Sequence, residues 1–233
     1  IDYTVGFDSS GRITALDVTH YTRCGWAQDL SLPVADRAML HADNAYHLND
    51  IRITSHRLKT NMQSATAFRG FGGPQGMVGI EKIIDHVAQH LGLDPLTVRR
   101  ANYYADRIAD VETSATAPIQ AASNPDADSA SRGADKPRPS SVPTPPKDVQ
   151  TTPYDQPVTD CIINALTDQL AESCDYAERR NSIAVWNADN PILKRGIALT
   201  PVKFGISFTL THLNQTGALV HVYQDGSIHL NHG

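Results

Sequence analysis

A glycine-rich loop is the part of this sequence best suited to chemistry. Residues 69–76 read Arg-Gly-Phe-Gly-Gly-Pro-Gln-Gly, and glycines let a backbone approach a ligand closely and expose its N–H groups. A helix expected after the loop would point its positive end at that ligand, which suits an anionic or oxo-bearing group. The spacing is not the dinucleotide fingerprint, because Gln75 replaces its third glycine, and no Gly-Lys-Ser/Thr of a P-loop follows. The residues alone leave a tight turn and a ligand loop both open.

Two phenylalanines are candidates for holding a planar ligand. Phe71 is flanked by glycines and has few neighbours within the loop, so it is free either to stack on a ligand or to fix the loop to the core. Phe208 could stack in the same way, and Thr209 could donate a hydrogen bond. Taken alone, however, residues 204–209 resemble an ordinary core strand.

Composition excludes several classes of protein. The 233 residues carry a formal net charge of −5, which argues against nucleic-acid binding, and no apolar run approaches the roughly 20 residues of a membrane span. The cysteines Cys24, Cys161 and Cys174 are too few for a disulfide framework, so a reducing, cytoplasmic location is expected. They also cannot supply the four thiolates of a typical [2Fe–2S] centre. His86 and His90 lack the glutamate of a zinc motif and are expected to be exposed.

The elements that must position the loop predict an α+β fold with mixed β-sheets and packed helices. Strands are expected over 3–7, 12–21, 51–58, 196–209, 218–223 and 228–231, with a hairpin turn at 225–226. Helices are expected over 36–41, 77–91, 95–102, 162–177 and 177–187. Gly92 should end the second of these helices and Asp94 should cap the next. Residues 70–76 are expected to be irregular, because they hold four glycines and a proline.

A Pro/Ser/Ala-rich segment divides the chain. Seven of the 14 prolines fall between residues 118 and 146, and a segment so poor in apolar residues is expected to be disordered. The predicted organisation is a first part over 1–104, a disordered insertion or linker over 105–157 and a second part over 158–233. Both ends of the chain lie in or next to strand-like sequence, which indicates a fragment of a longer polypeptide.

Residues 66–77 resemble the molybdopterin-domain signature of the xanthine dehydrogenase/oxidase family. Further matches follow the family's order at 37–46, 201–209, 213–219 and 221–227. The resemblance implies a partial molybdopterin-binding domain of a molybdenum hydroxylase. In that family a molybdenum–molybdopterin centre oxidises hypoxanthine and xanthine to urate with oxygen from water. Electrons then pass through [2Fe–2S] clusters and FAD to NAD.

The resemblance also implies roles for individual residues. Arg37 matches the arginine that faces the purine, where a permanent positive charge would stabilise negative charge developing on the substrate. Phe71 and Phe208 match the two rings that hold the purine, and Thr209 matches a neighbouring hydroxyl donor. The residues that match the backbone beside the cofactor are Arg69, Gly70, Phe71 and Gly72. The molybdenum itself is expected to take no direct protein ligand.

The resemblance has further implications for partners and activity. The iron–sulfur clusters and FAD must lie on a partner chain or on missing sequence, and a homo- or hetero-oligomer is expected. The family's catalytic glutamate is expected beyond Gly233, so this chain alone should be inactive and should not retain the cofactor. One alternative is an aldehyde oxidase-type hydroxylase, which Arg37 disfavours. Others are a non-catalytic phosphate- or nucleotide-binding module and an interaction protein built around the proline-rich residues 143–146.

Overall fold

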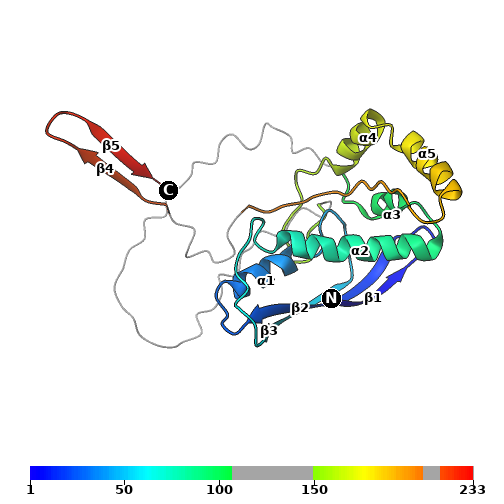
Figure 1. The fold of residues 1–233 in the computed structure, drawn as a ribbon, viewed down its shortest axis with the longest axis horizontal. Coiled ribbons are helices and arrows are strands. Elements are labelled where there is room, and N and C mark those ends of the chain that lie inside the picture. Colours follow the sequence, from blue (N-terminus) through cyan, green and yellow to red (C-terminus); the bar gives the residue numbers. More distant parts are fainter. Residues whose placement is uncertain (107–148, 207–215, 233) are drawn as a thin grey trace.

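The computed structural model describes residues 1–106, 149–206 and 216–232, which form mixed sheets with packed helices (Figure 1). The first sheet has the order β1-β2-β3, with β1 Asp2–Phe7, β2 Ile13–Gly25 and β3 Ile51–Lys59. β1 is antiparallel to β2, whereas β3 is parallel to β2. The parallel pair needs a crossover connection, and helix α1, Ser31–Leu40, lies within it. The expected α+β class with mixed sheets is confirmed, and the helix predicted over 36–41 is longer than expected.

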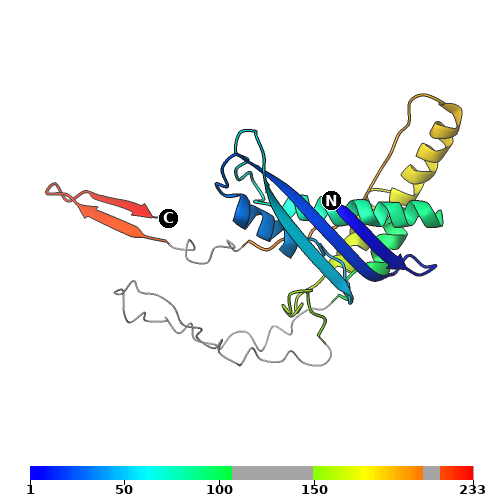
Figure 2. The same ribbon diagram turned by 90° about the horizontal axis from the view of Figure 1, so that it is seen from below.

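Helix α2, Gly73–Leu91, covers one face of this sheet and builds the core (Figure 2). Ile80, Ile83, Ile84 and Val87 are all at most 2% exposed, and they form one cluster with apolar residues of β2. This is the apolar stripe that the 3.6-residue spacing predicted. Gly92 follows the helix in the left-handed conformation with φ +67°, as a C-terminal stop requires.

The start of α2 differs from the prediction that residues 70–76 are irregular. The helix already begins at Gly73, and Pro74 is tolerated in its first turn because the missing N–H has no intrahelical partner there. Gly76 has a packing role. A Cβ at this position would lie 2.1 Å from the carbonyl oxygen of Ala38, so α1 and α2 can approach this closely only because the residue is glycine. Glycines that suggested a loop therefore serve helix packing.

Three more helices were anticipated by the sequence. α3 runs Pro95–Asn102, and the Asp94 side chain caps it by accepting a hydrogen bond from the Leu96 N–H at 2.8 Å. α4 runs Ile163–Ser173 and α5 runs Tyr176–Asp189. Exposed His86 and His90 agree with the expectation for that pair.

Residues 107–148 of the predicted linker lie outside the described residues. Residues 149–157, predicted to belong to the same segment, are fixed to the rest of the fold. Gln150 hydrogen-bonds the His47 ring at 2.9 Å and accepts from the Ala105 N–H at 2.7 Å. A bridge pairs Thr151 with Pro157. The proposed domain boundaries stay a prediction.

The strand predicted over 196–209 is wrong for residues 196–206, which form no regular element; residues 207–209 lie outside the described part. The alternating pattern misled because this segment is held by side chains of other elements rather than by a neighbouring strand. β4 Ala218–Val222 and β5 Ile228–His232 form the expected antiparallel hairpin. Every residue of both strands is exposed, and Figure 1 and Figure 2 both show the hairpin standing away from the first sheet.

Candidate functional site

An extended segment crosses the end of α1, and we call residues 201–206 the strap. Arg37 lies in the last turn of α1 and is only 4% exposed. Its Nη1 donates to the carbonyl oxygen of Gly205 at 2.6 Å. Four residues further along, His41 hydrogen-bonds the carbonyl oxygen of Arg37 through Nδ1 at 2.9 Å and accepts from the Gly205 N–H through Nε2 at 3.0 Å. Both the N–H and the carbonyl group of Gly205 are thus hydrogen-bonded to side chains at the end of α1.

The loop after α1 holds the first half of the strap. Asn44 is fully buried, and its amide nitrogen donates to the carbonyl oxygen of Pro201 at 2.9 Å while its amide oxygen accepts from the Lys203 N–H at 3.0 Å. The ammonium group of Lys203 pairs with the buried carboxylate of Asp43. Tyr104 donates to the same carboxylate oxygen at 3.0 Å. These contacts use side-chain groups in place of a strand partner.

The glycine loop has an uncommon backbone. Gly70, Phe71 and Gly72 have φ of +90°, +50° and +99°, so three successive residues occupy a region that favours glycine. For Phe71 this conformation is strained by about 1–2 kcal/mol. Such strain gathers at functional sites, and here it lets the chain turn directly into α2. A Cβ on Gly72 would lie 2.0 Å from the Val34 carbonyl oxygen, so the loop rests directly on α1.

Phe204 of the strap lies over the N-terminus of α2. A Cβ added to Gly73 would lie 2.6 Å from the Phe204 ring, so this glycine makes room for the aromatic side chain. The Phe204 ring centroid is 5.1 Å from that of His41 and 5.4 Å from the guanidinium carbon of Arg37. The structure therefore gathers a buried cation, an imidazole and an aromatic ring beside the glycine loop.

The residues predicted from the sequence are placed as follows. Arg37 lies on α1, which Gly72 and Gly76 contact, and its guanidinium carbon is 5.4 Å from the ring centroid of Phe204, which packs against Gly73 of the glycine loop. Arg69 is exposed at the start of the loop. Phe208 and Thr209 lie outside the described residues, so the predicted pairing of Phe71 with Phe208 is untested.

Two buried ionisable groups near the strap have shifted pKa values. Burial lowers the pKa of His41, and the nearby charges of Arg37 and Lys203 act in the same direction, so the ring favours its neutral form. Burial raises the pKa of Asp43, although the ion pair with Lys203 and the Tyr104 hydrogen bond oppose this. The protein thus places an uncharged acceptor under Gly205.

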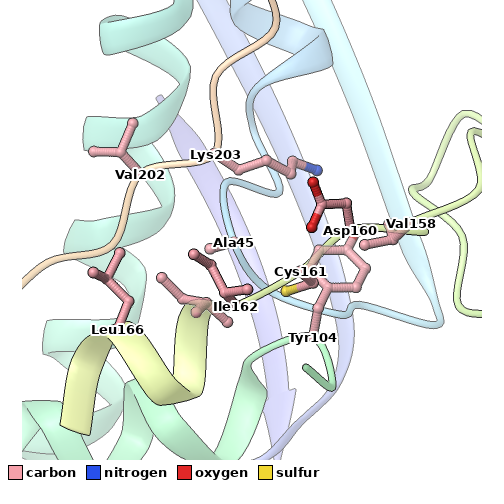
Figure 3. A pocket seen from close by; sticks show the side chains of 10 residues that line it. Ala45, Tyr104, Val158, Asp160, Cys161, Ile162, Leu166, Val202 and Lys203 are labelled. Carbon is pink, nitrogen blue, oxygen red and sulfur yellow. The ribbon is translucent and has the colours of Figure 1, made fainter. Parts of the chain in front are cut away.

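Two cavities flank the strap at Lys203. One, about 170 Å³, is lined mostly by apolar side chains, with Leu166 and Val202 on one side and Tyr104 and Cys161 on the other (Figure 3). The second, about 280 Å³, is lined by residues that include His41, Tyr154 and Phe204. Burial raises the pKa of the Cys161 thiol, which does not favour a reactive thiolate.

The described residues contain no cluster of three or more histidine, cysteine, aspartate or glutamate side chains able to hold a metal ion. Cys24, Cys161 and Cys174 are all free thiols. Among the helices that the structure describes, none has the length and apolar character needed to cross a membrane.

Sequence reasoning missed Phe204, His41 and Asn44. His41 had one available signal, since it lies four residues after Arg37 and so shares its helix face. No spacing rule could link these residues to the strap, because Asn44 and Pro201 are 157 residues apart in the chain. Phe204 lies shortly before the predicted site residues Phe208 and Thr209, but nothing in the sequence distinguishes it from a core phenylalanine.

Comparisons with known proteins identify the domain families that both parts of the chain match. Residues 1–103 and residues 169–233 each match a molybdopterin cofactor-binding domain family. Xanthine dehydrogenase of Drosophila subobscura is 40% identical over 231 residues, covering 99% of this chain and 14% of the relative. Xanthine dehydrogenase/oxidase of Mus musculus is 38% identical with the same coverage. The chain thus spans about one seventh of the length of these relatives.

A solved structure supports the fold. Quinoline 2-oxidoreductase from Pseudomonas putida 86 superimposes with a TM-score of 0.53 and 20% identity, covering 80% of this chain and 19% of that protein. The two regions that match the domain families, residues 1–103 and 169–233, contain the glycine loop, Arg37 and the strap. The chain therefore belongs to the xanthine dehydrogenase family and forms part of its molybdopterin cofactor-binding region.

Proposed function

We propose that this chain is part of a xanthine dehydrogenase that hydroxylates hypoxanthine and xanthine to urate. One observation carries the proposal: Arg37 is buried, and its guanidinium lies next to Phe204, whose ring packs against Gly73 of the glycine loop. Burying a permanently charged group costs free energy unless other contacts compensate for it. Arg37 is held in place by a hydrogen bond to the Gly205 carbonyl oxygen. In such a low-dielectric site, a fixed cation strongly stabilises negative charge that develops on a purine during attack.

The residues of the glycine loop fit the molybdenum–molybdopterin group. The loop backbone has positive φ throughout 70–72, and the positive end of α2 begins at the next residue. The exposed guanidinium of Arg69 adds a cation for an anionic group. Residues 69–72 would hold the cofactor on this side. When bound, the cofactor would supply oxygen transfer and take up two electrons.

The protein's own groups then orient the substrate. Phe71 would stack on the flat purine, and Arg37 would face its far side. Phe208 and Thr209 complete this proposal as a second ring and a hydroxyl donor, on the strength of the family resemblance alone. Phe204 adds an aromatic wall at the N-terminus of α2, next to Arg37.

The rest of the reaction requires parts beyond this chain. Electrons would leave through [2Fe–2S] clusters and FAD to NAD, on a partner subunit or on further sequence. The complete protein would be a cytoplasmic oligomer. The 233-residue chain alone should therefore retain no stoichiometric molybdenum and form no urate. Molybdenum analysis and a urate assay on the purified chain test this, and stoichiometric metal together with turnover would contradict it.

Substitution of Arg37 tests the purine assignment in the intact enzyme. Arg37→Met should lower kcat for xanthine by about a hundredfold or more, because it removes the fixed positive charge but keeps an apolar side chain of similar length. Aldehyde substrates, which need no such charge, should retain most of their turnover. Arg100→Met in α3 is the control, since Arg100 pairs with Asp168 at the surface. Unchanged xanthine turnover in the Arg37 variant would instead favour the aldehyde oxidase-type alternative.

A further inference from the structure

Three hydrogen bonds join Arg37, His41 and Gly205 into a closed ring. His41 Nδ1 lies 2.9 Å from the carbonyl oxygen of Arg37, and His41 Nε2 lies 3.0 Å from the backbone nitrogen of Gly205. The Gly205 carbonyl oxygen accepts from Arg37 Nη1 at 2.6 Å, which closes the ring. A carbonyl oxygen needs a donor and an N–H needs an acceptor, so His41 must be neutral with its proton on Nδ1.

We infer that His41 is a positioning residue for the guanidinium of Arg37, acting through the backbone of the strap. The inference rests on the proposed function, in which Arg37 stabilises charge on the substrate. The imidazole fixes the N–H of Gly205, and the carbonyl group of the same residue directs the guanidinium. Loss of the acceptor on His41 would release Gly205 and with it the orientation of Arg37, while leaving the positive charge present.

The surroundings of the ring make these bonds strong and specific. His41 is 6% exposed and Arg37 is 4% exposed, so water competes little for their hydrogen bonds. The Phe204 side chain covers both of them, with its centroid 5.1 Å from the imidazole centroid. The charged groups that face His41 are Arg37, Lys203 and Asp43. Burial and the two cations favour the neutral ring, and together they outweigh the opposing effects of Asp43 and of the hydrogen bond to the Arg37 carbonyl oxygen.

Two amide substitutions separate the two ends of the imidazole. In His41→Asn, the shorter amide can still donate to the Arg37 carbonyl oxygen but cannot reach the Gly205 N–H. In His41→Gln, the longer amide can place its oxygen near the former Nε2 and accept from Gly205. In the intact enzyme we expect His41→Asn to lower kcat for xanthine by about tenfold or more, with a smaller change in KM. His41→Gln should stay within about threefold of the wild type.

Coupling to Arg37 distinguishes positioning from general stability. In an Arg37→Met background, His41→Asn should lower kcat no further, because no guanidinium remains to be oriented. An equal loss in both backgrounds would overturn the inference. If Arg37→Met alone left xanthine turnover unchanged, the proposed function and the inference would both fall. A large loss for Arg37→Met with none for His41→Asn would overturn the inference only.

Hydrogen exchange gives a readout that needs no cofactor or turnover. In His41→Asn, backbone amides of the peptide that covers 201–206 should exchange faster, whereas His41→Gln should keep wild-type exchange. The exposed residue His86 supplies a control, His86→Asn, which should change neither exchange nor kcat. Unchanged exchange of the strap in His41→Asn would overturn the inference.

A pH profile covers the case in which His41→Asn does not fold. Protonation of His41 removes its acceptor, so wild-type kcat should fall at low pH with a component that His41→Gln lacks. Identical acid limbs in the wild type and in His41→Gln would overturn the inference.

Discussion

The body of the fold, residues 1–104, and the strap, residues 201–206, are held by different forces. The body is closed by apolar packing, with Ile83, Ile84 and Val87 of α2 each at most 1% exposed. The strap leaves Val202 and Ile206 67% and 91% exposed, and it depends on hydrogen bonds from side chains of the body. Apolar packing tolerates exchanges that conserve volume, whereas a hydrogen bond needs one donor and one acceptor. Substitutions in the body should therefore change mainly the free energy of unfolding. Substitutions that remove hydrogen bonds to the strap should change mainly the orientation of the site.

The largest expected effect falls on the charged network inside the body. Arg99 has a side chain 1% exposed, and it donates to Glu81 and to Asp85, each at 2.8 Å. Glu81 also accepts from Tyr46 at 2.6 Å and from Asn44 at 2.9 Å. Arg99→Met leaves the mostly buried carboxylate of Glu81, whose side chain is 14% exposed, without its cation. The chain should lose about 3–5 kcal/mol of unfolding free energy, measured by urea denaturation.

The neighbouring arginine provides a matched control for that experiment. Arg100 pairs with Asp168 across a surface where both side chains are more than a third exposed. Its replacement by methionine should change the unfolding free energy by only about 0–1 kcal/mol. Equal losses in the two variants would mean that burial does not decide the strength of these pairs.

A core substitution sharpens the comparison next. Ile84→Ala in α2 removes buried methyl groups and leaves a cavity, so it should destabilise the chain by about 2–5 kcal/mol. Val185→Ala in α5 is the control. That side chain is 67% exposed, and its loss should stay within about 0.5 kcal/mol. The same urea titration measures both, and a comparable loss in α5 would show that this helix has a core of its own.

The contrast also explains how much of the fold the sequence could predict. The stripe of α2, the Gly92 stop and the Asp94 cap follow from local rules of spacing and hydrogen bonding, so they were predictable. The hairpin around residues 225–226 follows from a two-residue turn signal in the same way. Each of these features needs only residues that are close in the sequence.

The site depended on contacts that no local pattern encodes. The four glycines and the proline of residues 70–76 predict a loop at Gly76, since nothing local in the sequence shows that this residue packs against the Ala38 carbonyl oxygen of another helix. The alternating residues of the strap predict a strand, and they give no sign that Asn44 and His41 bind its backbone. The resemblance to a family singled out Arg37 and the glycine loop, but it did not predict what holds them.

Acid sensitivity provides a smaller test that compares body and strap directly. His20, in β2 of the body, and His41, under the strap, are each 6% exposed, and burial lowers both pKa values below the ordinary 6.5. The unfolded chain therefore binds more protons than the folded chain as the pH falls through 6.5. Stability should be full above that pH and should decline on acidification towards the folded pKa values. Each histidine contributes a slope of at most about 1.4 kcal/mol per pH unit.

Substituting each histidine in turn shows whether the body or the strap causes the loss of stability on acidification. Replacing His20 or His41 by glutamine should flatten the decline between about pH 7.5 and pH 5.5, because glutamine does not titrate. Asp43 opposes the histidines at lower pH, since burial raises its pKa above 3.8 and its protonated form favours the folded state there. If the decline persisted in the His20 and His41 variants alike, buried histidines would not be its source. Flattening by the His41 substitution alone would instead place the acid-sensitive contact in the strap, where one proton removes the acceptor for Gly205.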